Sequence, residues 1–163
     1  IITSRDLRRS TAAATKINEE FEGERVHGVE AQTPEEVGKA VEKAEVILSA
    51  GAAGIQLLPL NVLRDYGKNC KIVADINAIP PLGVEGLKSK TEGEEFLPKI
   101  FGIGALAIGK LKNAVEAELI KRAAEEPKGI FDYKTAYEIA RKTVLGKIEE
   151  KKSQVVAEKH WLP

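Results

Sequence analysis

The 163-residue sequence contains no methionine, a single cysteine and no apolar run long enough to span a bilayer. Because Cys70 is alone, no internal disulfide can form, and a reducing, cytoplasmic setting is expected. The 25 basic and 25 acidic residues balance, so no net field attracts nucleic acid or an anionic membrane, and neither is expected as a partner. Any anion that the protein binds must be held by a few local groups.

Residues suited to metal or nucleophilic chemistry are equally scarce. His27 and His160 have no second histidine or carboxylate at ligand spacing, so no metal site is predicted. Cys70 lies near no helix N-terminus or histidine that would activate its thiol. Ser49 lacks the G-x-S-x-G pattern of a nucleophile elbow. These absences disfavour a hydrolase and favour chemistry that a bound cofactor carries, such as hydride transfer.

The sequence does contain an alternation of apolar runs and helical patterns, each of which predicts one element. Strands are predicted at residues 1–4, 25–31, 45–50, 71–77 and 100–105, and helices at residues 6–22, 33–44, 51–67, 106–126 and 133–152. The third and fourth strands are apolar on both faces, which is typical of parallel strands covered by helices on both sides. We therefore predict an α/β fold with a Rossmann-like, doubly wound parallel sheet and C-terminal helices.

Helix starts differ in the strength of their signals. The second helix has the clearest one, with Thr33 as N-cap, Pro34 at the first helical position and Glu36 completing a capping box. Asp132 is the expected N-cap of the last helix. Pro59 weakens the helical pattern of the third.

The remaining segments predict loops and a tail. Residues 78–98 are rich in charged residues and contain three prolines, so an exposed loop is predicted there. We expect one domain, with a core at residues 1–105, helices at 106–152 and a tail at 153–163. Trp161 and Leu162 in that tail are expected to dock on another subunit or domain.

Residues suited to a ligand follow the first and third predicted strands, and the carboxyl ends of parallel strands bind ligands in open α/β sheets. Ser4 and Arg5 end the first strand, where a hydroxyl and a planar guanidinium suit the 2′-phosphate of NADP. A solvated basic helix start is the alternative. The third strand is followed by small residues that let a flat ring approach the backbone, or that simply form a tight turn. They are Ser49, Ala50, Gly51, Ala52 and Gly54.

The fourth strand runs into "ADINAIPPLG", where Asp75 and Asn77 either orient a ligand or satisfy loop amides. Pro80 and Pro81 stop the strand, and either X-Pro bond can be cis. The three strand ends together predict one crevice. By contrast, "GIGALA" at residues 102–107 matches a dinucleotide fingerprint only formally, because one helix fills the interval where a second strand is required. Close packing of a helix start and a backbone that lines a ligand cleft are its two explanations.

Four stretches resemble the C-terminal, cofactor-binding part of the NADP-dependent methylene-tetrahydromethanopterin dehydrogenases, which are related to methylene-tetrahydrofolate dehydrogenases. They are "AGAAGIQLLP", "VADINAIPPLGVEGL", "GALAIGKLK" and "KGIFD". The resemblance implies oxidation of methylene-tetrahydromethanopterin, or of a tetrahydrofolate derivative, to its methenyl form, with hydride transfer to NADP. It implies no strong general base, because the two nitrogens that flank the reacting carbon stabilise the cation.

The resemblance also implies roles for particular residues. The cofactor would be contacted by Ser4, Arg5, the "SAGAAG" segment and Asn77. The substrate would be contacted by Asp75, Ala78, Pro80 and Pro81. Lys112 matches a lysine that the family places on the pterin side of its active site. Taken alone, a lysine beside Lys110 in a helix is usually solvated.

The sequence departs from the family in one large respect. The family's first Rossmann strand, its glycine-rich phosphate loop and its N-terminal domain have no counterpart, and the sequence starts on the strand pattern "IITS". We therefore expect a piece of a longer, homo-oligomeric enzyme, which alone binds NADP weakly and is inactive. Two alternatives stay open: another NADP-dependent dehydrogenase, of shikimate type, and a nucleotide- or pterin-binding module without catalysis.

Overall fold

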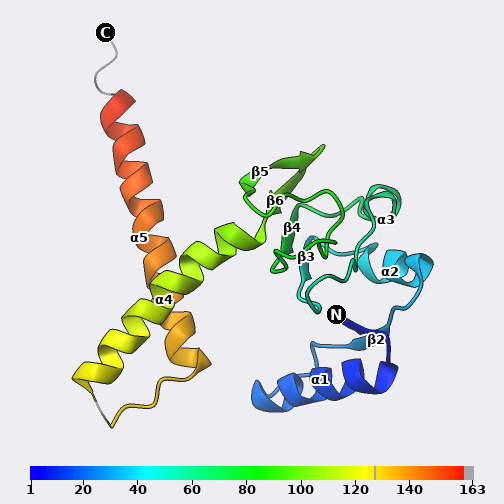
Figure 1. Cartoon of the computed structure of the whole chain (residues 1–163), viewed down its shortest axis with the longest axis horizontal. Helices are drawn as coiled ribbons and strands as arrows, with labels where there is room; N and C mark the ends of the chain where they lie inside the picture. The colour runs from blue at the N-terminus through cyan, green and yellow to red at the C-terminus, as the bar shows by residue number, and fades with distance from the viewer. Residues whose placement is uncertain (127, 160–163) are drawn as a thin grey trace. The chain divides into compact units, whose positions relative to one another are not determined.

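The computed structural model describes residues 1–126 and 128–159, with side chains through residue 149. Its elements divide between two units, Ile1–Ala107 and Ile108–Pro163, each of which is described by itself. All strands found in the described ranges belong to the first unit, and helices α4 and α5 supply the second (Figure 1). The fold is mixed α/β, as predicted, and all strand pairs but one are parallel.

Strands β1 (Ile2–Ser4) and β2 (Gly28–Glu30) pair in parallel and form a small sheet of their own. Helix α1 (Leu7–Glu20) packs along them and begins at Asp6, whose Oδ1 accepts a hydrogen bond of 2.9 Å from the Arg8 amide. The helix approaches β2 so closely that a Cβ on Gly28 would lie 2.3 Å from the Thr11 nitrogen. Glycine is therefore required at that contact.

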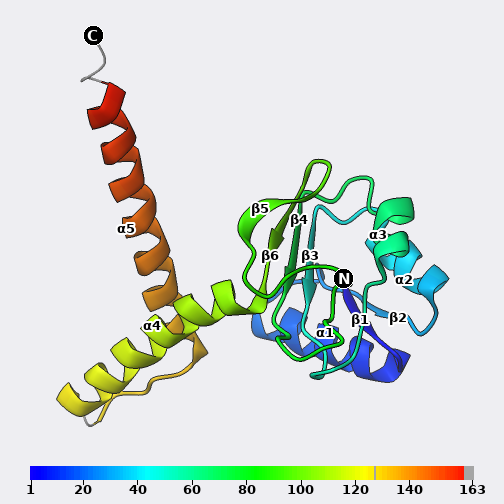
Figure 2. The same cartoon turned by 45° about the horizontal axis from the view of Figure 1, so that its top comes forward.

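The larger sheet has the strand order β3, β4, β6, β5, which Figure 2 shows side by side. Strands β3 (Val46–Ser49), β4 (Ile72–Asp75) and β6 (Ile100–Ile103) are parallel, and β5 (Glu92–Leu97) is antiparallel to β6. The prediction of a loop throughout 78–98 is therefore wrong at β5. This edge strand exposes its glutamates to water. It was not predicted because it lacks the apolar pattern by which the other strands were recognised.

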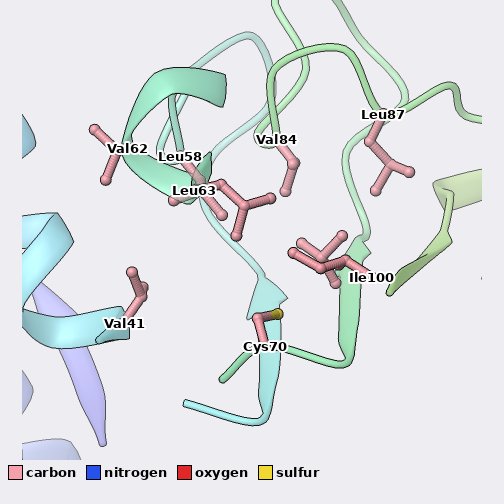
Figure 3. Packing of buried hydrophobic residues seen from close by; sticks show 9 residues of the cluster. Val41, Leu58, Val62, Leu63, Cys70, Val84, Leu87 and Ile100 are labelled. Atoms are coloured by element: carbon pink, nitrogen blue, oxygen red, sulfur yellow. The ribbon is translucent and has the colours of Figure 1, made fainter. Parts of the chain in front are cut away.

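The main core lies between one face of the larger sheet and helices α2 (Pro34–Val41) and α3 (Leu60–Tyr66). Figure 3 shows its side chains, among which Leu63, Val84 and Leu87 are fully buried. The predicted capping box of α2 is confirmed, because Thr33 and Glu36 exchange side-chain to backbone hydrogen bonds. Helix α3 is shorter than the predicted 51–67 and begins only after Pro59, its N-cap.

The opposite face of the larger sheet carries exposed apolar side chains. Val46 and Leu48 on β3 are 62% and 61% exposed, and Phe101 on β6 is also exposed. Val46, Ile72 and Phe101 are cross-strand neighbours and so share this face. The prediction that helices cover both faces is therefore wrong for the part of the first unit that the structure describes.

The second unit contains α5 (Tyr133–Lys159) and most of α4 (Ala105–Glu125). Val115 on α4 and Ile139 on α5 are buried. Asp132 starts α5 as predicted, since its Oδ1 accepts from the amides of Lys134 and Thr135 at 3.0 and 3.2 Å. Helix α5 continues through most of the predicted tail.

The predicted contacts of Trp161 and Leu162 lie outside the described residues, as does His160. Within the ranges searched, no helix is both long and apolar enough to cross a membrane.

Cys70, in the core beside β4, gives a test of how the core responds to pH. Its buried thiol donates a hydrogen bond of 3.3 Å to the Ile72 carbonyl oxygen, and burial raises the pKa of the thiol. The unfolded chain then loses the thiol proton at a lower pH than the folded one, so the free energy of unfolding falls as pH rises above about 8.5. We expect Cys70→Ala to flatten this fall in urea unfolding between about pH 7 and about pH 9.5. Equal slopes in the two proteins would contradict the expectation.

Candidate functional site

The candidate site lies where β3 and β4 end. These strands pair in parallel with Ser49 directly opposite Asp75, so both side chains mark the same edge of the sheet. Two loops leave this edge: residues 50–59 lead to α3, and residues 76–87 follow β4. We call these the first and second rim loops. Open α/β sheets bind ligands at this edge.

Asp75 fixes the second rim loop. Its carboxylate is 2% exposed and accepts two hydrogen bonds of 3.0 Å, from the amides of Asn77 and Val84. The buried Asn77 in turn accepts from the Ile79 amide at 3.0 Å. Both side chains therefore satisfy loop amides, which is one of the two interpretations that the sequence left open.

Gly83 joins the second rim loop to the first. Its carbonyl oxygen accepts from the amides of Leu57 and Leu58 at 2.8 and 2.9 Å. The Glu85 amide donates back to the Leu58 carbonyl at 3.0 Å, and the Asn77 side-chain amide lies 3.5 Å from the Ala52 carbonyl oxygen. The rim loops thus form one hydrogen-bonded unit.

Ser49 lies beneath this unit and is screened from solvent. Its hydroxyl is buried and has no hydrogen-bond partner among the described residues. A Cβ added to Gly83 would lie 2.1 Å from the Ser49 Oγ and 2.7 Å from the Asp75 Oδ1. Only glycine fits there, so the Ser49 side chain faces Gly83 and its hydroxyl oxygen is not exposed to a ligand in this structure.

The exposed surface of the rim loops is mainly apolar, and its one charged residue is Glu85, whose carboxylate accepts a hydrogen bond of 2.7 Å from the Leu60 amide. Ala50, Ala52 and Ala78 are exposed, as are the larger side chains of Ile76 and Ile79. Such a surface suits a planar ring. The sequence reasoning missed the two isoleucines, whose signal was an apolar residue placed directly after a strand.

The glycines and prolines of the rim loops have local explanations. Gly54 has a positive φ of 74°, which glycine adopts readily, and a Cβ on Gly51 would meet the Leu57 side chain at 2.4 Å. Pro80 and Pro81 are exposed, and the bond between them is cis.

Ser4 and Arg5 lie at the end of β1, in the other sheet. The Ser4 Oγ accepts from the Asp6 amide at 3.2 Å, so its proton can still be donated to a ligand, and Arg5 is exposed. No hydrogen bond of the described strands joins β1 to β3. The structure therefore brings together the ends of β3 and β4, and the predicted crevice of three strand ends stays a prediction.

Lys112 belongs to the second unit. Its Nζ lies 3.4 Å from Glu116 Oε1 one turn along α4, and the lysine side chain is 70% exposed. This is a solvated ion pair of ordinary kind, and a role at a pterin stays a prediction. The groups searched for a metal site, all among the described residues, include no cluster of three candidate ligands.

The glycines of "GIGALA" face protein atoms. A Cβ on Gly102 would lie 2.5 Å from the Leu87 side chain, and one on Gly104 would lie 2.3 Å from the Lys88 carbonyl oxygen. Close packing therefore accounts for both glycines without a ligand.

Comparison with known proteins gives two relatives, both from Methylorubrum extorquens AM1. The chain is 34% identical over 143 residues to a bifunctional protein named MdtA, an alignment that covers 86% of this chain and 48% of that protein. It is also 34% identical over 118 residues to an NAD(P)-dependent methylenetetrahydromethanopterin dehydrogenase, covering 71% of this chain and 39% of that enzyme. The chain is thus similar to a methylenetetrahydromethanopterin dehydrogenase.

The chain spans about half the length, or less, of the curated relatives it matches. No protein-family model matches it. The resemblance read from the sequence is therefore supported over most of this chain and over part of each relative.

Gly83→Ala tests the contact between the second rim loop and the strand ends. The added methyl has no room beside Ser49 and Asp75, so we expect the free energy of unfolding to fall by about 1–3 kcal/mol. Gly109→Ala is the matched control, because Gly109 lies in α4 with open space around it. That change should raise the free energy of unfolding by up to about 1 kcal/mol. Urea unfolding measures both, and a Gly83→Ala protein as stable as the original would show that the loop does not rest on Ser49.

Ser49→Ala tests whether the buried hydroxyl contributes to the stability of the fold. Because its oxygen has no partner among the described residues, removing it should leave the free energy of unfolding unchanged or raise it by about 1 kcal/mol. It should also restore part of the stability lost in Gly83→Ala, since the Ser49 Oγ is the nearest obstacle. A loss above about 1 kcal/mol in urea unfolding would reveal a partner for the hydroxyl.

Proposed function

We propose that the chain is the cofactor-binding part of an oxidoreductase that transfers a hydride from methylene-tetrahydromethanopterin, or a methylene-tetrahydrofolate, to NADP. The observation that carries the proposal is the 34% identity to an NAD(P)-dependent methylenetetrahydromethanopterin dehydrogenase. The chain covers less than half of that enzyme, so activity, substrate and a homo-oligomeric state are proposed for a longer protein. The product would be the methenyl form.

The proposal includes a Rossmann-like arrangement of the two sheets. In both views β1 and β2 lie on the β3 side of the larger sheet (Figures 1 and 2). Among the described strands, β1 pairs only with β2, and β3 pairs only with β4. One further parallel strand between β1 and β3 would give the doubly wound order, with β2 and β1 on one side of it and β3, β4 and β6 on the other. Ser4 and Arg5 would then lie on the same rim as Asp75.

The residues of the first unit suit NADP in two respects. Arg5 is exposed and Ser4 has a proton to donate, so the two can hold a phosphate at the end of β1. The uncharged rim at Ala50, Ala52 and Ala78 leaves the backbone open to a flat ring. When bound, the nicotinamide ring supplies the hydride acceptor.

The chain's own contribution is then to bind and orient. The rim loops are held by backbone hydrogen bonds, so they can keep a ring at a fixed height over the strand ends. Their apolar side chains exclude water from the transferred hydride. No general base is assigned, because the substrate nitrogens stabilise the cation that forms.

Coenzyme choice provides the sharpest test of this assignment. We expect NADP⁺ to shift the amide resonances of Ser4, Arg5 and the first rim loop in residues 1–163. Arg5→Asp should weaken NADP⁺ binding about tenfold or more relative to NAD⁺, because it removes a charge-assisted contact to the 2′-phosphate. Arg25→Asp is the control, since it makes the same charge change before β2, at the opposite end of the small sheet.

Equal losses in the two variants would mean that only net charge matters, and the role of Arg5 would be wrong.

A separate assay decides the reaction class in the longer protein. NADPH should appear with methylene-tetrahydromethanopterin or methylene-tetrahydrofolate as donor. Reduction of a carbonyl substrate instead would favour a shikimate-type enzyme, and binding of NADP⁺ without turnover would favour a non-catalytic module.

A further inference from the structure

The carboxylate of Asp75 is the only buried acidic side chain among the residues whose side chains the structure describes, and it touches no basic group there. Its two hydrogen bonds come from backbone amides at either end of the 76–84 segment. We propose that Asp75 is a positioning residue, which sets the place of both rim loops together and thereby the affinity of the rim for its ligand. The ligand part of this inference rests on the proposed function.

The coupling runs through one residue. Val84, whose amide donates to Asp75, directly follows Gly83, whose carbonyl receives the amides of Leu57 and Leu58. The position of Gly83 is fixed twice, by the Asp75 bond to its neighbour and by its own contact with Ser49 and Asp75. Asp75 therefore fixes the end of the second rim loop, and this end in turn fixes the position of the first rim loop.

The first rim loop has few other restraints within the rim. Its residues 52 and 53 are exposed, and Gly54 has a positive φ. Besides the bonds to Gly83, the second rim loop reaches it through the Glu85 amide, which donates to the Leu58 carbonyl at 3.0 Å, and through the long contact between Asn77 Nδ2 and the Ala52 carbonyl, at 3.5 Å. Asn77 is itself held by Asp75 through its amide. The connections at Gly83 and Glu85 flank Val84, whose amide Asp75 binds, so all three connections lead back to the same carboxylate.

Asp75→Asn isolates this role with little change in shape. An amide side chain has only one acceptor oxygen, and its NH₂ would face one of the two backbone amides. One charge-assisted hydrogen bond is lost and the other becomes neutral. We expect local opening of the rim, measured by amide hydrogen exchange, to increase about tenfold to hundredfold.

The pattern of exchange separates positioning from general destabilisation. Exchange should rise at Asn77 and Val84, one of which loses its acceptor while the other keeps a weaker one, and also at Leu57 and Leu58, whose amides do not bind Asp75. The Val73 amide in β4 should keep its protection, because that strand is held by its neighbours. Asp65→Asn, at an exposed position of α3, is the matched control and should change none of these amides.

Two results would overturn the inference. Faster exchange at Asn77 and Val84 alone would limit Asp75 to its own loop, and an equal rise at Val73 would mean that it serves stability only. If Asp75→Asn does not fold, native-state exchange of the unmodified chain in low denaturant decides. The amides of Leu57, Leu58, Asn77 and Val84 should then open with one common free energy, and unrelated values would refute the coupling.

The ligand arm uses NADP⁺ as the probe, titrated against the unmodified chain, Asp75→Asn and Asp65→Asn. The dissociation constant should rise about tenfold in Asp75→Asn only. An unchanged constant despite faster exchange would refute the link to affinity. If the four amides respond as expected and NADP⁺ binds none of the three proteins, the loop coupling stands and the proposed cofactor-binding role of residues 1–163 fails.

Discussion

The rim depends on a carboxylate that the strand carries into the protein interior. A buried charge is costly unless hydrogen-bond donors surround it, and β4 ends with Asp75 on the covered face of its sheet. The donors come from the chain that follows, so the chain has to return to the strand end after leaving it. Pro80 and Pro81 lie on this return path and cannot donate to a strand. Val84 completes it by donating to the carboxylate and by entering the core.

This constraint explains why the rim can be mainly apolar on the outside. Polar groups of the two loops form hydrogen bonds with each other. The Gly83 carbonyl accepts from the amides of Leu57 and Leu58, and the Asn77 side chain is buried. The exposed atoms are then mainly those of alanine, isoleucine and proline side chains. Hydride transfer to a nicotinamide needs orientation and a dry surface more than acids or bases, and an arrangement of this kind offers both.

The parts of the structure that depend on neighbouring residues were predictable from the sequence. The capping box of Thr33 and Glu36 spans one helical turn, and the amide-satisfying role of Asp75 and Asn77 was one of two stated interpretations. The contact between Gly83 and Ser49 joins segments far apart in the chain, and no local pattern encodes it. The same holds for strand β5, which forms by pairing with β6. Its glutamates are typical of an exposed loop, and the sequence pattern therefore predicted a loop there.

The division into two sheets was missed for a related reason. Apolar runs predict strands but do not say which strand pairs with which, and β1 and β3 each have one edge without a partner among the described strands. The side chains of Val46 and Leu48 are exposed, whereas helices normally cover both faces of a parallel sheet. This face of β3 therefore lacks a covering element within the described first unit. The proposed strand between β1 and β3, followed by a helix, would satisfy both needs at once. Each of the two matched relatives contains more chain outside the aligned region than within it, which is ample for such a unit. Placing it there would also bring Ser4 and Arg5, whose donors suit a phosphate, onto the same rim as Asp75. The proposed phosphate site and the proposed apolar site for the ring would then belong to one surface.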